Sequence, residues 1–340
     1  MQTTETLQIE LPGIGEPESL RPRHRTLPAP GPGQALVRME ATGVSFAEQQ
    51  MRRGKYYDQP SFPFVPGYDL VGIVEQVGPA DGGGDAPVLR SGQRVAALTK
   101  TGGWAERVVL DAGDLVPLPD GLDAVAAETA IVNGATAWRM LHRSARVRSG
   151  QTVVVLGAAG GVGSLLVQLA HHAGVAVIGV AGERQRTAVE ALGATFLDRR
   201  SDDLVARVRE LAPEGVAAVF DHVGGAGIVG SWRMLARGGT LVSYGTAATK
   251  DLPGNPRLPV LKLLGRLLLW NALPNGRSAH FFNLWAGRRR RDRYRAELRA
   301  DLQRVFALLA DGTLRAQVAA RFPLSDAAAA LRFAEAGGHA

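Results

Sequence analysis

The stretch TVVVLGAAGGVG, residues Thr152–Gly163, decides the fold of this chain. It opens with β-branched and aliphatic residues without polar alternation, which is typical of a strand buried on both faces of a parallel sheet. Glycines follow directly, and the next segment, SLLVQLAHHA (Ser164–Ala173), has apolar residues at helical spacing. A strand, a glycine turn and a helix in this order predict a nucleotide site, because the glycines let the backbone approach a pyrophosphate and the helix N-terminus offers it free N–H groups.

The glycines fit the dinucleotide pattern G-x-G-x-x-G imperfectly. When the pattern ends at Gly163, Ala158 occupies its first position and Gly160 its second, with Gly157 and Gly161 beside them. An ordinary strand-to-helix turn is the alternative interpretation, since 42 glycines among 340 residues can form such a pattern by chance. The flanking strand and helix favour nucleotide binding.

The chain from about Ala124 onward alternates helix-like and strand-like segments. This alternation predicts a doubly wound parallel sheet, which binds ligands at the carboxyl ends of its strands. Glycines after Asp221 and Tyr244 fall at that edge. Helices are expected over 124–143, 164–173 and 185–192, and strands over 152–156, 175–180, 217–221 and 239–244.

The chain before about Asp123 is rich in glycine, proline and short strand-like runs, which predicts a mainly antiparallel domain. A loop is expected at residues 82–84 and a short helix over 46–53. The expected strands are 34–40, 70–78, 93–98 and 105–110.

Composition narrows the function classes. The chain has no cysteine, which removes disulfides, thiolate zinc ligands and cysteine nucleophiles. The N-terminal MQTTETLQIELPG has no basic segment followed by an apolar one, so we expect a cytoplasmic protein without a signal peptide. The formal net charge is +7, and the run RRRRDRYR (288–295) contributes much of it. We interpret this run as a solvated surface segment; a nucleic-acid patch is the alternative, but no nucleic-acid fold motif accompanies it.

Residues 258–273, LPVLKLLGRLLLWNAL, are very apolar but include Lys262 and Arg266. The segment is too short and too charged for an integral membrane span. A buried helix, an interface helix or a lid is expected, and a peripheral membrane helix is a further alternative. Two more helices are expected near the C-terminus, over 295–310 and around the alanine run 327–330.

Eight segments occur in the order and spacing of a known family: GVSFAEQQMRRGKYY (43–57), FPFVPGYDLVGIVEQVG (62–78), GGWAERVVL (102–110), NGATAW (133–138), VVVLGAAGGVGSLLVQLA (153–170), ALGAT (191–195), FDHVGG (220–225) and GGTLVSYGT (238–246). On these segments the chain resembles the medium-chain dehydrogenase/reductases, in their zinc-independent quinone oxidoreductase-like branch. The resemblance covers almost the whole chain.

The family implies an α/β fold of two domains. A GroES-like, mainly antiparallel β catalytic domain would comprise residues 1–123, with 288–340 returning to it. A Rossmann doubly wound parallel-sheet domain would comprise 124–287, and the active site would lie in the cleft between the two. The family also implies a homodimer and a further strand after the terminal helix, which the residues following Ala336 do not resemble.

Zinc members of the superfamily have a cysteine where this chain has Ser45 and a histidine where it has Tyr68. Neither ligand is present, and a carboxylate without soft partners is a poor zinc site, so no metal is expected. Glu48 and Asp69 are expected to be structural, salt-bridged residues.

Reduction of an enone or quinone places negative charge on an oxygen, which a protein group must stabilise. Zinc-free relatives have an asparagine at the position of Ser45 and often a tyrosine at that of Tyr56. The resemblance therefore implies Ser45 and Tyr56 as catalytic residues. Tyr57 could replace Tyr56, and a plain packing role for Tyr56 stays open.

The cofactor expected is NADP(H). NAD binders place a carboxylate at the end of the second strand, but here that strand ends at Gly182 and is followed by Glu183 between arginines. Arg186 matches a family lysine that faces the 2′-phosphate, and arginine suits phosphate. The remaining cofactor-binding residues implied are Thr136, Ala158, Gly160, Gly161, Val162, Arg184, Val223, Tyr244, Gly245, Phe281 and Phe282.

The resulting hypothesis is a zinc-independent, NADPH-dependent oxidoreductase that reduces a quinone or an activated enone or enoyl double bond of a small molecule. Alternatives are a biosynthetic tailoring enzyme acting on a polycyclic ketone, and a non-reducing member of the fold that binds nucleotide or acts through an interaction surface. No nucleic-acid partner is expected.

Overall fold

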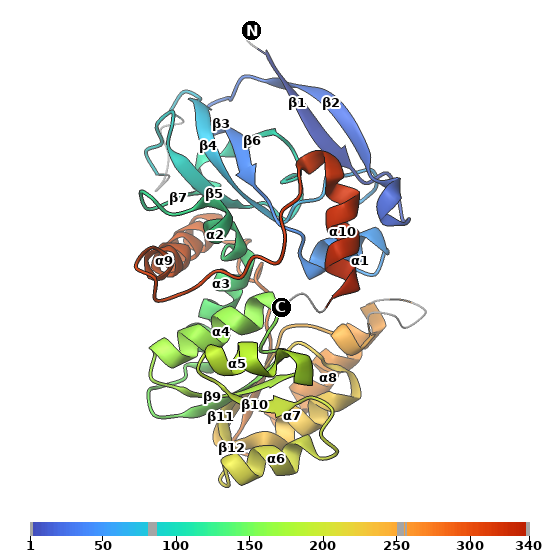
Figure 1. Cartoon of the computed structure of the whole chain (residues 1–340), viewed down its shortest axis with the longest axis vertical. Helices are drawn as coiled ribbons and strands as arrows, with labels where there is room; N and C mark the ends of the chain where they lie inside the picture. The colour runs from blue at the N-terminus through green and yellow to red at the C-terminus, as the bar shows by residue number, and fades with distance from the viewer. Residues whose placement is uncertain (1–2, 81–86, 250–254, 256, 338–340) are drawn as a thin grey trace. The chain divides into compact units, whose positions relative to one another are not determined.

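The computed structural model describes residues 3–80, 87–249, 255 and 257–337, which form two compact units (Figure 1). The first unit comprises the chain up to Ala135 together with the chain from Gly287 onward. The second unit comprises Thr136–Ala286. Each unit has its own sheet and its own hydrophobic core.

The first unit is built on a five-stranded antiparallel sheet in the order β6-β3-β4-β5-β7. Its core includes Val37, Leu70 and Val95. Residues next to them in the strands are buried as well, so the middle of this sheet is covered on both faces. The strands are β3 Gln34–Ala41, β4 Asp69–Val77, β5 Arg94–Leu98, β6 Arg107–Asp111 and β7 Leu115–Pro117. The predicted mainly antiparallel domain is confirmed.

A long hairpin, β1 Thr3–Glu10 with β2 Arg21–Pro28, precedes this sheet and was not among the expected strands. Its outer strand β2 is polar and exposed along most of its length, so no apolar alternation marks it in the sequence. Short 3₁₀ turns lie at η1 Pro17–Ser19, η2 Ala112–Asp114 and η7 Leu324–Asp326, and the helices are α1 Phe46–Arg52, α2 Ala124–Thr129, α9 Arg291–Ala310 and α10 Ala327–Ala336.

Within the first unit, part of the arginine run 288–295 fastens α9 to the end of β6 and to η2. The guanidinium of Arg295 donates to Asp114 at 2.6 Å and to Asp111 at 3.1 Å, and Arg291 also pairs with Asp111. Arg295 is only 16 % exposed at its side chain, so it is a structural member of a run expected to be solvated.

The second unit contains a six-stranded parallel sheet in the order β10-β9-β8-β11-β12-β13. The chain order along the sheet reverses between β8 and β11, which is the topological switch point at which such sheets bind dinucleotides. The strands are β8 Thr152–Leu156, β9 Ala176–Ala181, β10 Thr195–Asp198, β11 Val216–Asp221, β12 Leu235–Ser243 and β13 Ser278–Phe281. The predicted doubly wound parallel sheet is confirmed.

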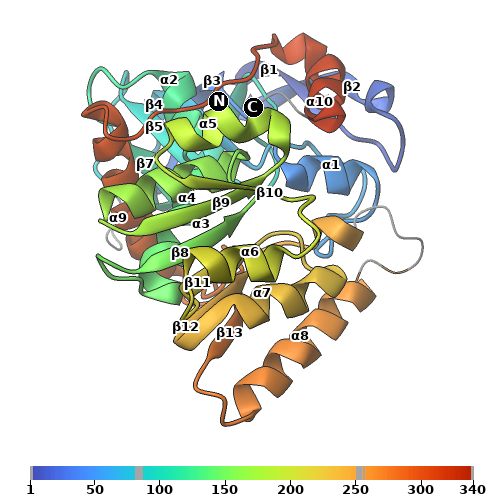
Figure 2. The ribbon, with the colours of Figure 1, turned by 60° about the horizontal axis from the view of Figure 1, so that its bottom comes forward.

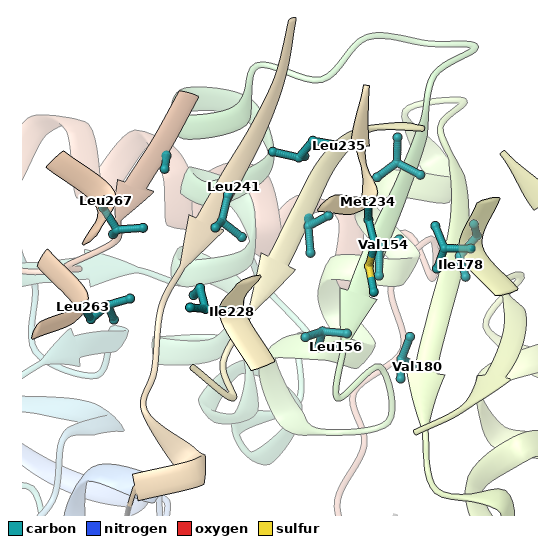
Figure 3. Packing of buried hydrophobic residues seen from close by; sticks show 14 residues of the cluster. Val154, Leu156, Ile178, Val180, Ile228, Met234, Leu235, Leu241, Leu263 and Leu267 are labelled. Carbon is teal, nitrogen blue, oxygen red and sulfur yellow. The ribbon is translucent and has the colours of Figure 1, made fainter. Parts of the chain in front are cut away.

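Helices pack on this sheet through a core that includes Val154, Leu241 and Leu263 (Figure 3). Besides α3 Val132–Trp138, which crosses the boundary between the units, the helical elements are η3 Arg139–Ala145 (a π-helix), α4 Gly161–His172, η4 Glu183–Gln185, α5 Arg186–Ala191, α6 Leu204–Leu211, η5 Gly225–Gly227, α7 Ile228–Met234, η6 Ala247–Thr249 and α8 Arg257–Ala272.

The helix expected over 124–143 is broken into α2, α3 and the π-helical turn. The Asp69 carboxylate accepts a hydrogen bond from the Val132 backbone N–H at 3.1 Å, which starts a new helix there. Because α2 packs on β4 and β3, residues 124–135 belong to the first unit. The structural boundary therefore lies twelve residues after the one expected at 123/124. The loop expected at 82–84 lies outside the described residues.

Candidate functional site

The glycine turn after β8 has a shape that requires glycine. Gly157 has φ +71°, and its N–H and that of Ala158 both donate to the Val180 carbonyl of β9, at 2.8 and 3.1 Å. A Cβ on Gly163 would lie 2.0 Å from the Gly157 oxygen. The turn is therefore packed backbone against backbone, and the first turn of α4 lies directly on the end of β8.

Helix α4 begins at the turn with Gly160 as its N-cap residue. The N–H groups of its first turn, in Gly161, Val162 and Gly163, have no acceptor within the helix, and they carry the positive end of the helix dipole. Ala158 is fully buried and its methyl group lies toward Gly179, so only its backbone could contact a ligand. The turn is a cradle for a diphosphate at the switch point of the sheet.

The end of β9 carries arginines and no free carboxylate. Gly182 is the N-cap residue of η4, and the Glu183 carboxylate next to it accepts two hydrogen bonds from Arg186, at 2.7 and 2.9 Å. Arg186 also lies over the Phe196 ring at 4.3 Å. Arg184 is exposed.

A further arginine, Arg199, lies at the same place and was missed in the sequence. Its backbone N–H donates to the Ala181 carbonyl at 2.8 Å, and its guanidinium lies 3.8–3.9 Å from the position that a Cβ on Gly182 would occupy. Arg199 follows β10, which pairs with β9 in the sheet. The sequence feature that could have predicted its place is the pair Arg199–Arg200 directly after that strand.

The turns after β11 and β12 interlock. Buried Asp221 accepts hydrogen bonds from the Val223 and Gly224 N–H groups at 2.8 and 2.9 Å, which shapes the turn after β11. A Cβ on Gly245 would lie 2.6 Å from the His222 oxygen, so the turn after β12 lies against that turn. Burial, followed by the charge of Asp221, raises the pKa of Tyr244, so its phenol stays protonated.

The remaining predicted cofactor residues also lie in the second unit. Phe281 ends β13, and the Phe282 N–H donates to the Ser243 carbonyl at 2.7 Å. Thr136 is buried in α3. Because the strands are parallel, the residues that follow β8, β9, β11, β12 and β13 meet at one edge of the sheet.

In the first unit, Ser45 is the N-cap residue of α1. Its Oγ accepts from the Ala47 N–H at 3.0 Å and donates to the Glu48 carboxylate, which also accepts from the Ser45 N–H at 2.9 Å. The second oxygen of Glu48 accepts from the Tyr68 N–H at 2.7 Å. The one Ser45 proton is therefore engaged in a capping box, and a catalytic role for this residue stays a prediction.

Asp69 and Glu128 form a buried pair of carboxyl groups. They share a hydrogen bond, so at least one of them carries a proton. Burial raises the pKa of Asp69, and the charge of Glu128 raises it further. Burial likewise raises the pKa of Glu128 to about 7, against a lowering by the hydrogen bond with Asp69.

The expectation that Glu48 and Asp69 are salt-bridged is wrong. Their partners are a hydroxyl, backbone N–H groups and another carboxyl group, and among the described residues neither pairs with Lys or Arg. Desolvation without a cation is the physical reason that burial raises the pKa of both groups.

Tyr56 is half-buried and its hydroxyl lies 2.9 Å from the Tyr68 hydroxyl. Its ring lies 4.9 Å from that of Tyr57. Burial is the main cause that raises the pKa of Tyr56, and the neighbouring Tyr68 adds to it. Tyr56 is therefore a phenol that keeps its proton and can donate a hydrogen bond to an oxyanion.

The residues of this cluster do not fit a zinc ion. Both oxygens of Glu48 are engaged, Asp69 and Glu128 share a proton, and the sequence offers no thiolate. Across the described parts of the chain, no three His, Cys, Asp or Glu side chains are grouped so that they could hold a metal.

A GroES-like sheet unit joined to a parallel sheet with a glycine cradle at its switch point defines a dinucleotide-binding protein of the dehydrogenase type. Comparisons narrow this class. Residues 31–120 match the family described as alcohol dehydrogenase GroES-like domain, and residues 161–269 match the family described as zinc-binding dehydrogenase.

Individual relatives and a solved structure agree with this class of protein. The chain is 33 % identical over 243 residues to the synaptic vesicle membrane protein VAT-1 homolog of Mus musculus, covering 70 % of this chain and 59 % of that protein. It is 30 % identical over 249 residues to the quinone oxidoreductase of Pongo abelii, covering 72 % of this chain and 74 % of that protein. The solved structure of mycobacterial Rv1454c complexed with NADPH superposes with a TM-score of 0.81 at 31 % identity, covering 97 % of this chain and 96 % of that one.

The chain belongs to the medium-chain dehydrogenase/reductase superfamily, in its quinone oxidoreductase-like branch, and the resemblance stated from the sequence is confirmed. The chain spans about three fifths of the length of the VAT-1 homologs that it matches.

Proposed function

We propose that this protein is a zinc-independent, NADPH-dependent oxidoreductase that reduces a quinone or an activated enone or enoyl double bond. The observation that carries the proposal is the glycine cradle of Gly157–Gly163 at the switch point, next to a strand end that bears arginines. The NADPH complex of the similar mycobacterial protein supports the cofactor assignment. The quinone oxidoreductase of Pongo abelii supports the acceptor class.

The cofactor, when bound, supplies the hydride. In this chain the N–H groups of Gly161 and Val162 would hold its diphosphate, and the turns at Val223 and Tyr244–Gly245 would line its path along the strand ends. Phe281, Phe282 and Thr136 complete the proposed set.

The arginines at the end of β9 are proposed to select the 2′-phosphate. Arg199 forms no ion pair among the described residues, whereas Arg186 is held by Glu183. We therefore assign the first phosphate contact to Arg199 and Arg184, and a second to Arg186, which must exchange Glu183 for phosphate.

The phenol pair Tyr56–Tyr68 is proposed to stabilise the oxygen of the acceptor. Because burial raises the pKa of Tyr56, this group acts as a hydrogen-bond donor that stays protonated rather than as a titrating acid. Ser45 would contribute only if its proton leaves Glu48. A cytoplasmic homodimer stays a prediction, which light scattering and cell fractionation would test.

Titration with NADPH and NADH, followed by the enhanced emission of the bound nicotinamide, tests the cofactor site. Wild type is expected to bind NADPH with micromolar or better affinity and at least tenfold more tightly than NADH. Arg199→Ala and Arg186→Ala should each reduce that preference, with the larger loss for Arg199→Ala. If these variants lost affinity equally for NADPH and NADH, the proposed contact of the arginines with the 2′-phosphate would be refuted.

Gly163→Ala tests the cradle itself, because its Cβ would lie 2.0 Å from the Gly157 oxygen. Gly227→Ala is the matched control, since nothing lies within 4 Å of its Cβ position. Loss of NADPH binding in Gly163→Ala alone, with a folded protein by circular dichroism, supports the site. Binding without oxidation by any quinone, enone or enoyl thioester would instead favour a non-reducing nucleotide-binding member of the fold.

A further inference from the structure

Tyr68 is held in place by its backbone directly before β4 begins. Its N–H donates to the Glu48 carboxylate at 2.7 Å, and its carbonyl accepts from the N–H groups of Thr99 and Lys100, both at 2.9 Å. The residue is only 6 % exposed. Both backbone polar groups of Tyr68 are therefore engaged, and its phenol is buried at a fixed place in the first unit.

Tyr56 lies in the connection from α1 to β4, outside any helix or strand (both elements are labelled in Figure 2). No regular hydrogen-bond pattern fixes the backbone at such a position. The Tyr56 hydroxyl lies 2.9 Å from the Tyr68 hydroxyl and also shares a hydrogen bond with Tyr57. Its place therefore depends on the neighbouring phenols.

Lys100 ties the two segments together. Its N–H donates to the Tyr68 carbonyl, and its ammonium group pairs with Asp58, two residues after Tyr56. Lys100 has φ +69°, a left-handed conformation that is costly for a residue with a side chain. The fold thus keeps a costly conformation at the point where the segment of Tyr56 is joined to that of Tyr68.

The number of protons limits what the two phenols can do. A phenol has one proton to donate and can accept two hydrogen bonds. If Tyr56 donates to Tyr68, its proton is used inside the protein and is not available to a ligand. If Tyr68 donates to Tyr56, the Tyr56 proton stays available, and the hydrogen bond that Tyr56 receives makes it a stronger donor.

Burial favours the second direction. Tyr68 is buried and Tyr56 is half-buried, so Tyr56 is the phenol that a ligand can contact. A buried hydroxyl donates within the protein, and the Tyr56 oxygen lies within hydrogen-bond distance of Tyr68. Tyr57 is a weaker anchor than Tyr68, because it lies in the same connection as Tyr56.

We propose that Tyr68 is a positioning residue that holds the Tyr56 hydroxyl in place and donates to it, so that the Tyr56 proton is directed at the oxygen of the acceptor. The inference rests on the proposed function, in which Tyr56 contacts that oxygen as negative charge develops on it. Tyr68 itself does not touch the acceptor and acts only through Tyr56.

A double-mutant cycle measured by steady-state kinetics tests this role. Tyr68→Phe should lower turnover about fivefold, the effect of losing one hydrogen bond between neutral groups, and should leave the affinity for NADPH within about twofold of wild type. In a Tyr56→Phe background the same substitution should change turnover by less than about twofold, because no phenol remains to be positioned. Tyr294→Phe on α9 is the matched control, since Tyr294 is also 6 % exposed, and should behave as wild type.

Replacement of Tyr68 by 3-fluorotyrosine tests the direction of the hydrogen bond. Fluorine makes the phenol a stronger donor and a weaker acceptor while changing its size little. In mildly acidic buffer, in which the fluorinated phenol keeps its proton, turnover should therefore stay at or above the wild-type value. The fluorine NMR signal reports the contact without any turnover, and Tyr56→Phe should shift it more than Tyr294→Phe does.

Circular dichroism melting establishes that each variant is folded. The inference is overturned if Tyr68→Phe lowers turnover equally in both backgrounds, because Tyr68 would then act apart from Tyr56. It is also overturned if 3-fluorotyrosine lowers turnover, or if Tyr56→Phe leaves the fluorine signal unmoved. In these cases the loss of turnover in Tyr56→Phe still supports the proposed function, whereas a folded wild type that reduces no acceptor overturns both.

Discussion

At the scale of single residues, two pairs of like side chains hold protons in the interior of the first unit. Tyr56 and Tyr68 share a hydrogen bond of 2.9 Å, and Asp69 and Glu128 share another. Burial raises the pKa of Tyr56 and of Glu128. Each group therefore keeps its proton to a higher pH than the same side chain would in water.

Tyr56→Phe should lower turnover about 10- to 100-fold and leave the affinity for NADPH within twofold of wild type, because the phenol is proposed to contact only the acceptor oxygen. Steady-state kinetics and cofactor titration measure both. Tyr57→Phe, at the neighbouring ring, should have the smaller effect. Because the pKa of Tyr56 is raised, wild-type activity should show no alkaline loss below pH 10 from this group. A larger loss in Tyr57→Phe would transfer the role to Tyr57.

Glu128 should make the protein less stable as the pH rises. Its pKa is about 7 in the folded chain against 4.5 for a free glutamate. The unfolded chain therefore ionises first as the pH rises, and the folded state loses stability between these values. Below pH 4.5 the two states hold the same proton and this penalty is absent. Glu128→Gln should therefore flatten the urea stability profile between pH 5 and 8.

Asp120→Asn, at an exposed carboxylate, is the control for that measurement and should leave the profile unchanged. If the stability of Glu128→Gln depended on pH as that of wild type does, the assignment of a shared proton to Asp69 and Glu128 would be contradicted.

At the scale of elements, the C-terminal helix α10 is joined to the N-terminal part of the first unit by a buried pair at Glu335, to which Arg53 adds a second cation at 3.0 Å, and by an exposed pair. Arg52 of α1 is 4 % exposed and donates two hydrogen bonds to Glu335, at 2.9 and 2.7 Å. Arg332 of α10 pairs with Glu18 of η1 on the surface. The two pairs hold the same helix but differ in solvation, so they test how much burial contributes.

Glu335→Ala should destabilise the protein by about 3 kcal/mol, because it leaves the buried Arg52 guanidinium without its bidentate partner. Glu18→Ala should cost less than about 1 kcal/mol, since exposed pairs are screened by water. Chemical denaturation of the two variants gives the comparison. Similar losses for both would show that the helix is held by its apolar contacts rather than by Arg52.

At the scale of the whole molecule, the division into two units predicts which parts of the chain the bound cofactor protects. NADPH at one hundred times its dissociation constant should stabilise the folded chain by about 2.7 kcal/mol. Hydrogen exchange should slow at Gly157–Gly163 and in the turns after β11 and β12, whereas the β1–β2 hairpin should exchange as before. Protection confined to the hairpin would place the cofactor elsewhere.

Much of the fold could be predicted from the sequence. The buried strand 152–156 was predicted to the residue, because apolar runs and glycine turns are local signals. The following helix was expected over 164–173 and begins three residues earlier, at Gly161. The capped helix α1 was predicted to within one residue for the same reason. Exposed polar strand β2 and the short strands β10 and β13 were missed, since little apolar pattern distinguishes them.

The sequence by itself determined the family, the parallel sheet and the position of the glycine cradle, because motif order, apolar runs and glycine turns are patterns that the chain carries before it folds. Only the tertiary structure decided the partners of the charged groups. The pairing of Arg186 with Glu183, the place of Arg199 beside Gly182 and the proton shared by Asp69 and Glu128 depend on side-chain positions that no residue pattern specifies. The exposure of the α8 leucines was likewise decided by packing, because helix periodicity cannot state which of two apolar sides meets the core.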